Sequence, residues 1–291
     1  MDSALTAVGL PVALGIIMLG LGLGLTVADF RRVVRFPRAA VVALGCQVLL
    51  LPALCFVLVL VLGLPPVLAV GMMLLAASPG GTTANLYSHL FGGHVALNVT
   101  LTAVNSVLAV VTLPIVVNLS AAHFLDGAAS IGLQFDKVLQ VFAIVLAPVA
   151  VGMALRARFP GVAERLARPV KIVSVVVLVA VVAGTVLKER ENVADYVVAV
   201  GLAVLIFNVV SLAVGYGAPR LAGVGRRESI AVGMEIGIHN STLAITIAVS
   251  PALLGNTEMA IPAAVYGIVM FFTAAAFGVL VTRRREREVA A

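Results

Sequence analysis

Nine apolar runs, each about long enough to cross a lipid bilayer, determine what this chain can fold into. The hydrocarbon core of a bilayer is about 30 Å thick, so a spanning helix needs roughly 20 predominantly apolar residues. The sequence therefore predicts an all-α polytopic membrane protein with about nine transmembrane helices, in which residues 1–291 form a single unit. The runs occupy residues 4–27, 39–62, 66–90, 95–120, 138–155, 170–187, 196–217, 229–251 and 260–282.

Composition and the positions of the basic residues support this interpretation. The chain is 62% hydrophobic and 11% charged, whereas soluble domains are about half apolar and a quarter charged. Lys and Arg collect in cytoplasmic loops. With the N-terminus outside and the C-terminus cytoplasmic, the inner connections would hold Arg31, Arg32, Arg35, Arg38, Arg156, Arg158, Arg165, Arg168, Lys171, Arg220, Arg226, Arg227, Arg283, Arg284, Arg285 and Arg287, and the outer ones only Lys137, Lys188 and Arg190.

This distribution explains the net charge of +6 without a nucleic-acid partner. We expect a multi-pass protein of the plasma (inner) membrane, in contact with lipid, that is a monomer or a weak homo-oligomer. The expected inner connection between the fifth and sixth runs is residues 156–169.

Two of the runs are interrupted at mid-depth by residues that break helices. The third contains Pro-Gly-Gly-Thr-Thr-Ala-Asn at 79–85, and the eighth contains Gly-Met-Glu-Ile-Gly-Ile-His-Asn-Ser-Thr at 233–242. Pro and Gly disfavour helix, and backbone groups freed inside a membrane must line a polar cavity or a protein interior. A simple packing kink is the alternative. The two runs cross the membrane in opposite directions, which is typical of transporters with inverted repeats and two broken crossing helices.

Glu235 is the one acidic residue predicted to lie well inside a span. A carboxylate there costs about 2.5–3.5 kcal/mol and usually has a partner, but no Lys or Arg lies at comparable depth. Either a bound cation with oxygen ligands or a proton would neutralise it. His239, one helical turn later, is either a hydrogen-bonded interior side chain or a ligand.

The fourth run carries polar residues at helical spacing. Asn98, Thr102 and Asn105 lie on one face of residues 95–120, followed by Ser106. They either form hydrogen bonds between helices or bind an ion.

Neither an intramembrane enzyme nor a ligand sensor is favoured. The chain has no His-Glu-x-x-His or Gly-x-Ser-x-Gly motif and no second carboxylate at the depth of Glu235. A sensor that binds without transporting would be expected to carry a soluble signalling domain. The pattern favours a secondary transporter.

Four segments resemble the bile acid:sodium symporter family: residues 14–30, Gln47 with its neighbours, 77–106 and 233–244. The resemblance implies a sodium-coupled symporter of a small organic anion, a carboxylate, that works by alternating access. A panel domain (4–27, 138–155, 170–187) would move against a core domain made of the other six helices. Proton coupling through Glu235 and His239 is the alternative.

The resemblance also implies the site residues. The first of two sodium ions would bind Asn85, Asn98, Thr102 and Glu235. The second would bind Gln47, Glu235, His239 and the backbone carbonyls of Ile236 and Ile238. The substrate would lie near Thr82, Thr83 and Asn240. The chain departs from the family at Ala84, where a hydroxyl is usual, at Asn98, where a hydroxyl is common, and at His239, where glutamine is usual. Small carboxylates such as pantoate, 2-oxo acids or pantothenate are favoured as substrates over sterols.

Overall fold

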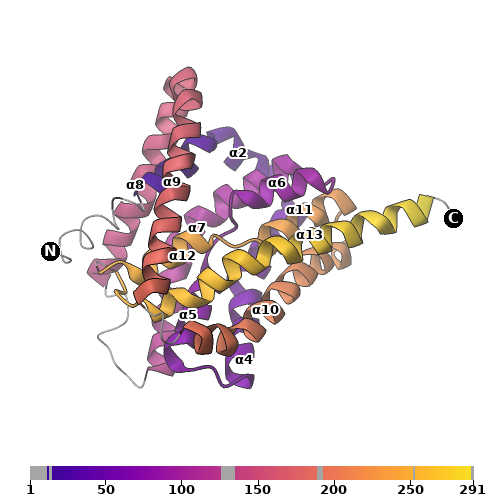
Figure 1. Ribbon diagram of the computed structural model, residues 1–291. Helices are drawn as coiled ribbons and strands as arrows, with labels where there is room; N and C mark the ends of the chain where they lie inside the picture. Colours follow the sequence, from indigo (N-terminus) through magenta and orange to yellow (C-terminus); the bar gives the residue numbers. More distant parts are fainter. Residues whose placement is uncertain (1–11, 13–14, 126–134, 189–192, 252, 290–291) are drawn as a thin grey trace.

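The computed structural model describes residues 12, 15–125, 135–188, 193–251 and 253–289, and nearly all of them are helical (Figure 1). The start of the first predicted span lies outside these residues. The helices are Gly15–Gly24, α2 (Val27–Arg31), α3 (Pro37–Gly45), α4 (Leu51–Val61), α5 (Pro66–Ala77), α6 (Thr83–Leu90), α7 (Val95–Phe124), α8 (Phe135–Arg158), α9 (Pro160–Lys188), α10 (Val193–Leu221), α11 (Arg226–Gly237), α12 (Ser241–Val249) and α13 (Ile261–Val289). Short turns complete the chain: η1 (Arg32–Arg35), the π-helical η2 (Cys46–Leu50) and η3 (Glu258–Ala260).

The all-helical membrane fold is confirmed in its coarse form. Four helices of the described residues are long and apolar enough to span a bilayer: Pro37–Val61, Val95–Phe124, Val197–Leu221 and Glu258–Thr282. Gly15–Gly24 and Pro66–Ala77 are apolar but shorter. The total of nine spans and their orientation stay predictions.

The segment 156–169, predicted to connect two spans, is almost entirely helical and is not a loop. Helix α8 continues to Arg158 and α9 begins at Pro160, so only Phe159 separates them. Proline is favoured in the first turn of a helix, because a backbone N–H at that position would have no intrahelical partner and its absence costs nothing. The Ala, Glu, Leu and Arg residues that follow favour helix, so charge in this segment does not mark a loop.

The third and eighth predicted spans are each broken into two helices, α5–α6 and α11–α12, and their breaks pair with each other. The Gly81 amide donates to the Ile238 carbonyl at 2.7 Å, and the Asn240 amide donates to the Pro79 carbonyl at 2.8 Å. These bonds form an isolated antiparallel bridge between Gly80 and His239. The interruptions are therefore true breaks, and each satisfies backbone groups freed in the other.

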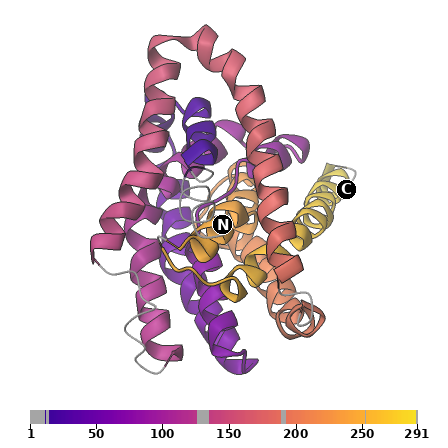
Figure 2. The ribbon, with the colours of Figure 1, turned by 60° about the vertical axis from the view of Figure 1, so that its left-hand side comes forward.

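The first helix packs closely against α8 through two glycines. A Cβ at Gly22 would lie 2.2 Å from the Val149 carbonyl oxygen, and one at Gly152 would lie 2.6 Å from the Leu19 carbonyl oxygen. Small residues let membrane helices approach backbone to backbone. Figure 2 shows α8 and α9 diverging from their junction, with the broken helices between and behind them.

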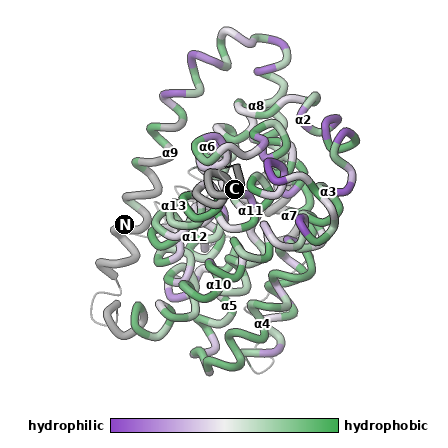
Figure 3. The backbone as a smooth tube through the Cα atoms, turned by 90° about the vertical axis from the view of Figure 1, so that its right-hand side faces the viewer, coloured by the Kyte–Doolittle hydropathy of each residue, from purple (hydrophilic) through white to green (hydrophobic). Residues whose placement is uncertain are grey.

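The connections that carry most basic residues meet at one end of the helices. Phe36 packs edge-on against His94 at 4.7 Å, and the His94 amide donates to the Arg227 carbonyl at 2.9 Å. Arg226 donates to the Val281 carbonyl. Figure 3 shows hydrophilic segments near α2, α3 and the α8–α9 junction, whereas α4, α5 and α10 are mostly hydrophobic.

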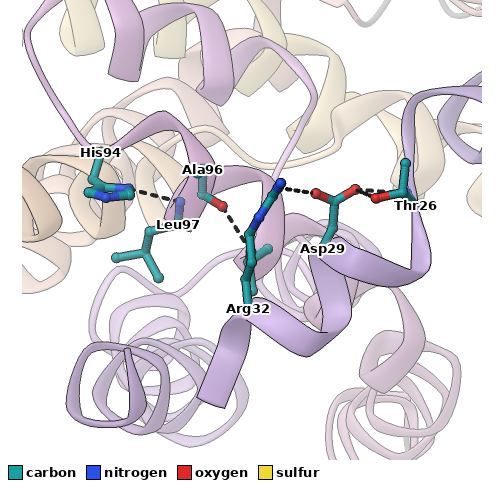
Figure 4. Close-up of polar contacts among 7 residues, drawn as sticks. Thr26, Asp29, Arg32, His94, Ala96 and Leu97 are labelled. Carbon is teal, nitrogen blue, oxygen red and sulfur yellow. Dashed lines mark hydrogen bonds and ion pairs between the residues drawn. The ribbon is translucent and has the colours of Figure 1, made fainter. Parts of the chain in front are cut away.

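At this end Asp29 fixes the turn that follows the first helix. Its carboxylate accepts from the Thr26 amide and hydroxyl, each at 2.7 Å, and pairs with Arg32 at 2.5 Å. Figure 4 shows this group beside the start of α7, where the His94 side chain accepts from the Leu97 amide. Asp29 therefore has a structural role at the base of the first helix.

Candidate functional site

The crossing of the two broken helices places Glu235 against α7. Glu235 is on α11, half a turn before the break, and its side chain is fully buried. The Thr102 hydroxyl donates to its Oε2 at 2.6 Å, and the Asn105 Nδ2 donates to its Oε1 at 3.4 Å. No basic side chain pairs with it among the described residues. The carboxylate is thus held only by neutral donors, which leaves its charge available to a cation.

Asn98 joins the same two helices one turn away. Its Nδ2 donates to the Ala231 carbonyl on α11 at 2.7 Å, and its own carbonyl lies 3.1 Å from the Thr102 hydroxyl. Because the amide nitrogen is committed to a carbonyl, the Oδ1 is left facing inward, and this buried oxygen has no hydrogen-bond partner. Asn98, Thr102 and Glu235, three of the four residues predicted to bind the first ion, therefore lie in one cluster.

Gln47 and His239 meet at a main-chain oxygen. The Gln47 Nε2 and the His239 Nδ1 each lie 3.0 Å from the Ser78 carbonyl oxygen. Since a carbonyl only accepts, His239 must carry its proton on Nδ1. Its Nε2, buried and unpartnered, is then a lone-pair donor, as is the unpartnered Gln47 Oε1. Gln47 reaches this point from the π-helical turn η2, a distortion frequent at functional sites.

Aromatic and polar residues that the sequence analysis did not select surround His239. Phe207 stacks on its ring at 5.6 Å and Tyr266 meets it edge-on at 5.4 Å. The Tyr266 hydroxyl and the Asn208 Nδ2 donate to the Gly237 carbonyl at 2.9 and 2.8 Å, and thereby cap the end of α11. The signal was weak: single polar residues within apolar runs.

The remaining predicted ion ligands are less closely joined. Asn85 is half-buried near the start of α6, and its Oδ1 is a further buried oxygen without a partner. The Ile238 carbonyl is already one partner in the crossing. Among the described residues, no hydrogen bond links Glu235 to Gln47 or His239, and Ile236 is fully buried. The structure thus brings together two separate clusters, one at Glu235 and one at Ser78.

The donor set fits a hard monovalent cation. Carboxylate, hydroxyl and amide oxygens are the ligands that such ions prefer, and buried polar atoms are normally satisfied. Among the described residues, four amide oxygens around the crossing lack partners: those of Gln47, Asn85, Asn98 and Asn105. Sodium would supply what these oxygens and the Glu235 carboxylate lack.

Of the three predicted substrate residues, only Asn240 lines a cavity at the crossing. Asn240 caps α12 by accepting from the Leu243 amide at 3.0 Å, and it lines a cavity together with Pro79 and Ser106. The first helix and α8 complete this cavity, whose volume of about 10 Å³ admits a single water-sized group. An organic anion does not fit in this conformation. Thr82 is exposed and Thr83 half-buried, and neither lines the cavity.

Three known proteins that this chain resembles are all named as sodium-dependent transporters or cotransporters. Residues 11–196 match the Sodium Bile acid symporter family. The chain is 30% identical to the uncharacterized sodium-dependent transporter YocS of Bacillus subtilis (strain 168) over 88% of this chain and 78% of that protein. It is 29% identical to a probable chloroplastic sodium/metabolite cotransporter, BASS2, of Oryza sativa subsp. japonica, over 92% of this chain but only 62% of that protein. It is 26% identical to the ileal sodium/bile acid cotransporter of Mus musculus, over 95% and 79%.

Proposed function

Because this chain belongs to the sodium bile acid symporter family, whose members are sodium-dependent transporters and not enzymes, we propose that it is a sodium-coupled secondary active symporter of a small organic anion. The surroundings of Glu235 carry the proposal. A fully buried carboxylate held by Thr102 and Asn105, without a basic partner among the described residues, is stable in a membrane interior only with a positive charge beside it or a proton on it.

In this proposal two sodium ions bind at the crossing. The first binds the Glu235 carboxylate with Thr102 and the free oxygens of Asn85 and Asn98. The second binds near the Ser78 carbonyl, with Gln47 Oε1 and His239 Nε2 as side-chain ligands. Two sodium ions with one monoanion move a net charge of +1, which adds about 2.3 kcal/mol of driving force per 100 mV.

The anion binds between the crossing and the pair formed by the first helix and α8. Asn240 and Ser106 offer polar groups there, and the short helix α12 starts at Asn240 with its positive dipole end. Because the cavity admits only one water-sized group, the first helix, α8 and α9 must move against the other helices before the anion enters. Such movement is alternating access between a panel and a core. We propose small carboxylates as the substrates. We also propose that the protein lies in the plasma (inner) membrane.

Proton coupling is the second candidate, because His239 Nε2 is buried and unpartnered, and Glu235, four residues earlier, has no basic partner among the described residues. Uptake by proteoliposomes separates the two candidates. Small carboxylates are first screened by thermal shift in sodium and in potassium, and uptake of those that stabilise the protein is then driven by a sodium gradient or by a pH gradient. We expect the sodium gradient alone to drive uptake. Uptake that does not depend on sodium at fixed pH contradicts sodium coupling. Substrate binding without counterflow indicates a sensor.

A further inference from the structure

A second cavity lies on the far side of the crossing from the substrate cavity, between α4 and α7. Gln47 and Pro52 line it from η2 and α4, Asn105, Thr112 and Val116 line it from α7, and Pro79 lines it from the break. Its volume of about 10 Å³ admits one water-sized group. Thr112 is seven residues beyond Asn105, so the residues that line the cavity from α7 span roughly 10 Å along the helix in the direction away from Glu235. Pro79 lines both cavities, so the broken segment separates them.

Two amide side chains lining this cavity have a free oxygen, and their hydrogen bonds fix which atom is free. The Gln47 Nε2 donates to two carbonyls, those of Ala76 and Ser78, so its Oε1 is left over. The Asn105 Nδ2 donates to the Glu235 carboxylate, which leaves its Oδ1. Both side chains are buried, at 4% and 2% exposure, and both oxygens lack a partner. Exchanging the oxygen and nitrogen of either amide would place its oxygen against carbonyl or carboxylate oxygens, which only accept hydrogen bonds.

The cavity therefore favours a small cation over an anion or a larger solute. Its lining contains no ionisable side chain, and its two free amide atoms are oxygens. An anion would face these oxygens with the Glu235 carboxylate behind Asn105, whereas a small cation gains ligands from them. Asn105 links the two places, since its nitrogen holds the carboxylate while its oxygen is free.

Beyond the lining residue Val116, an aromatic cluster joins α4 to the end of α7. The Phe56 ring of α4 lies 5.0 Å from His123 and 5.4 Å from Phe124 at the end of α7. This end of the molecule is opposite to the one where the Arg-rich connections meet, because α7 runs from His94 at that end to Phe124 at this one. By the charge distribution, it is the end predicted to be outside.

We propose that the cavity between α4 and α7 is the route by which sodium reaches Glu235, that Gln47 and Asn105 are its relay ligands, and that the organic anion uses the separate cavity at Asn240. This inference rests on the proposed sodium symport. A sodium ion that has lost most of its water passes Thr112, binds the free oxygens of Gln47 and Asn105, and then moves to the carboxylate. The Gln47 oxygen thus contacts the first ion in passing and afterwards serves the second ion as a ligand.

The test is to narrow the route at a distance from Glu235. Thr112→Phe fills the cavity from α7, and Ala109→Leu, a smaller change in the same lining, serves if the first variant folds poorly. Val111→Phe is the matched control, because residue 111 is on the same helix but about half exposed and outside the lining. Exchange of sodium with the purified full chain is measured by ²³Na nuclear magnetic resonance, together with the sodium concentration that gives half-saturation.

A plug in a route slows binding and release equally, so we expect exchange to slow at least tenfold in Thr112→Phe while half-saturation stays within twofold. Ala109→Leu should change in the same direction, and Val111→Phe should match the unmodified chain. Unchanged exchange in both lining variants overturns the route. A tenfold change in half-saturation also overturns it, because the residues then act on the ion site itself. An unmodified chain that binds no sodium overturns the proposed function together with the route.

Discussion

Gly80 lies directly against the carboxylate of Glu235: a Cβ built on residue 80 would be 2.2 Å from Oε1 and 2.6 Å from Oε2. Gly80 belongs to the break between α5 and α6, and Glu235 belongs to α11. The missing side chain at residue 80 is therefore what lets the two broken helices cross at the depth of the carboxylate. The Gly-Gly pair at this break removes steric bulk as well as helical propensity.

Gly80→Ala should displace the carboxylate and weaken sodium binding. Overpacking of this kind costs about 1–3 kcal/mol. Where the sodium-bound state bears this cost, it corresponds to a rise of roughly 5- to 150-fold in the half-saturating sodium concentration. The measurement is the sodium dependence of thermal stabilisation. Gly45→Ala is the matched control, since a Cβ at that helical glycine meets no atom within 4 Å. Equal sodium dependence in both variants would show that the close approach has no functional role.

Glu235→Gln should abolish sodium-dependent uptake. The amide keeps the shape of the side chain but removes the charge, and it places a donor where Thr102 and Asn105 already donate. Loss of a buried charge from a cation site costs several kcal/mol, so we expect a drop of more than about 100-fold in uptake at limiting sodium.

The control for this variant is Glu228→Gln, the same chemical change seven residues earlier on α11 and only half-buried. It should transport as the unmodified chain does. Near-normal uptake by Glu235→Gln, with protein levels matched in the membrane, would exclude Glu235 from ion coupling.

The parts of the site that depend on side-chain type could be predicted from the sequence. A lone carboxylate at mid-depth indicated a buried site at Glu235, and the resemblance to the family implied that Thr102 would share an ion with it. The Thr102 hydroxyl does donate to that carboxylate. Glycine and proline at both interruptions indicated the breaks. These signals are local, because charge burial and helical propensity act on each run separately.

The parts that depend on tertiary packing could not be predicted. The Ser78 carbonyl joins Gln47 and His239, but a main-chain oxygen has no signature in a sequence. Tyr266 and Asn208 meet at the Gly237 carbonyl only because α10 and α13 both pack against α11. Asn105 was placed on the correct face of its helix, yet its contact with Glu235 depends on how α7 is rotated.

Tyr266→Phe should destabilise the protein by about 1 kcal/mol, because it removes one of two hydrogen bonds to the buried Gly237 carbonyl. Thermal unfolding in detergent measures this. Tyr87→Phe removes the same hydroxyl from a more exposed bond to the Phe271 carbonyl, where water can replace it. We therefore expect a smaller shift for Tyr87→Phe, and an equal shift would contradict the capping role of Tyr266.

The close packing of the first helix on α8 can be tested by two alanine substitutions in one turn. Gly22→Ala places a methyl group 2.2 Å from the Val149 carbonyl oxygen, whereas Gly24→Ala meets no atom within 4 Å. We expect Gly22→Ala to lower stability by about 1–3 kcal/mol, because neither backbone can move aside without separating the helices. Gly24→Ala should be neutral or slightly stabilising. If both variants unfold alike, the two helices do not pack as the structure describes.

His239→Gln should increase sodium affinity while retaining transport. In the structure, His239 donates from Nδ1 to the Ser78 carbonyl and leaves Nε2 unpartnered. A glutamine can donate to the same carbonyl through its amide nitrogen, and it offers an oxygen in place of the imidazole nitrogen. The oxygen is the better ligand for a hard cation. We expect the half-saturating sodium concentration for uptake to fall about three- to tenfold, equivalent to roughly 1 kcal/mol. His239→Leu, which can neither donate nor accept, should raise that concentration instead. If His239 carries a coupling proton, His239→Gln should abolish uptake driven by a pH gradient and leave the dependence on sodium unchanged, so the two coupling mechanisms predict opposite outcomes for one substitution.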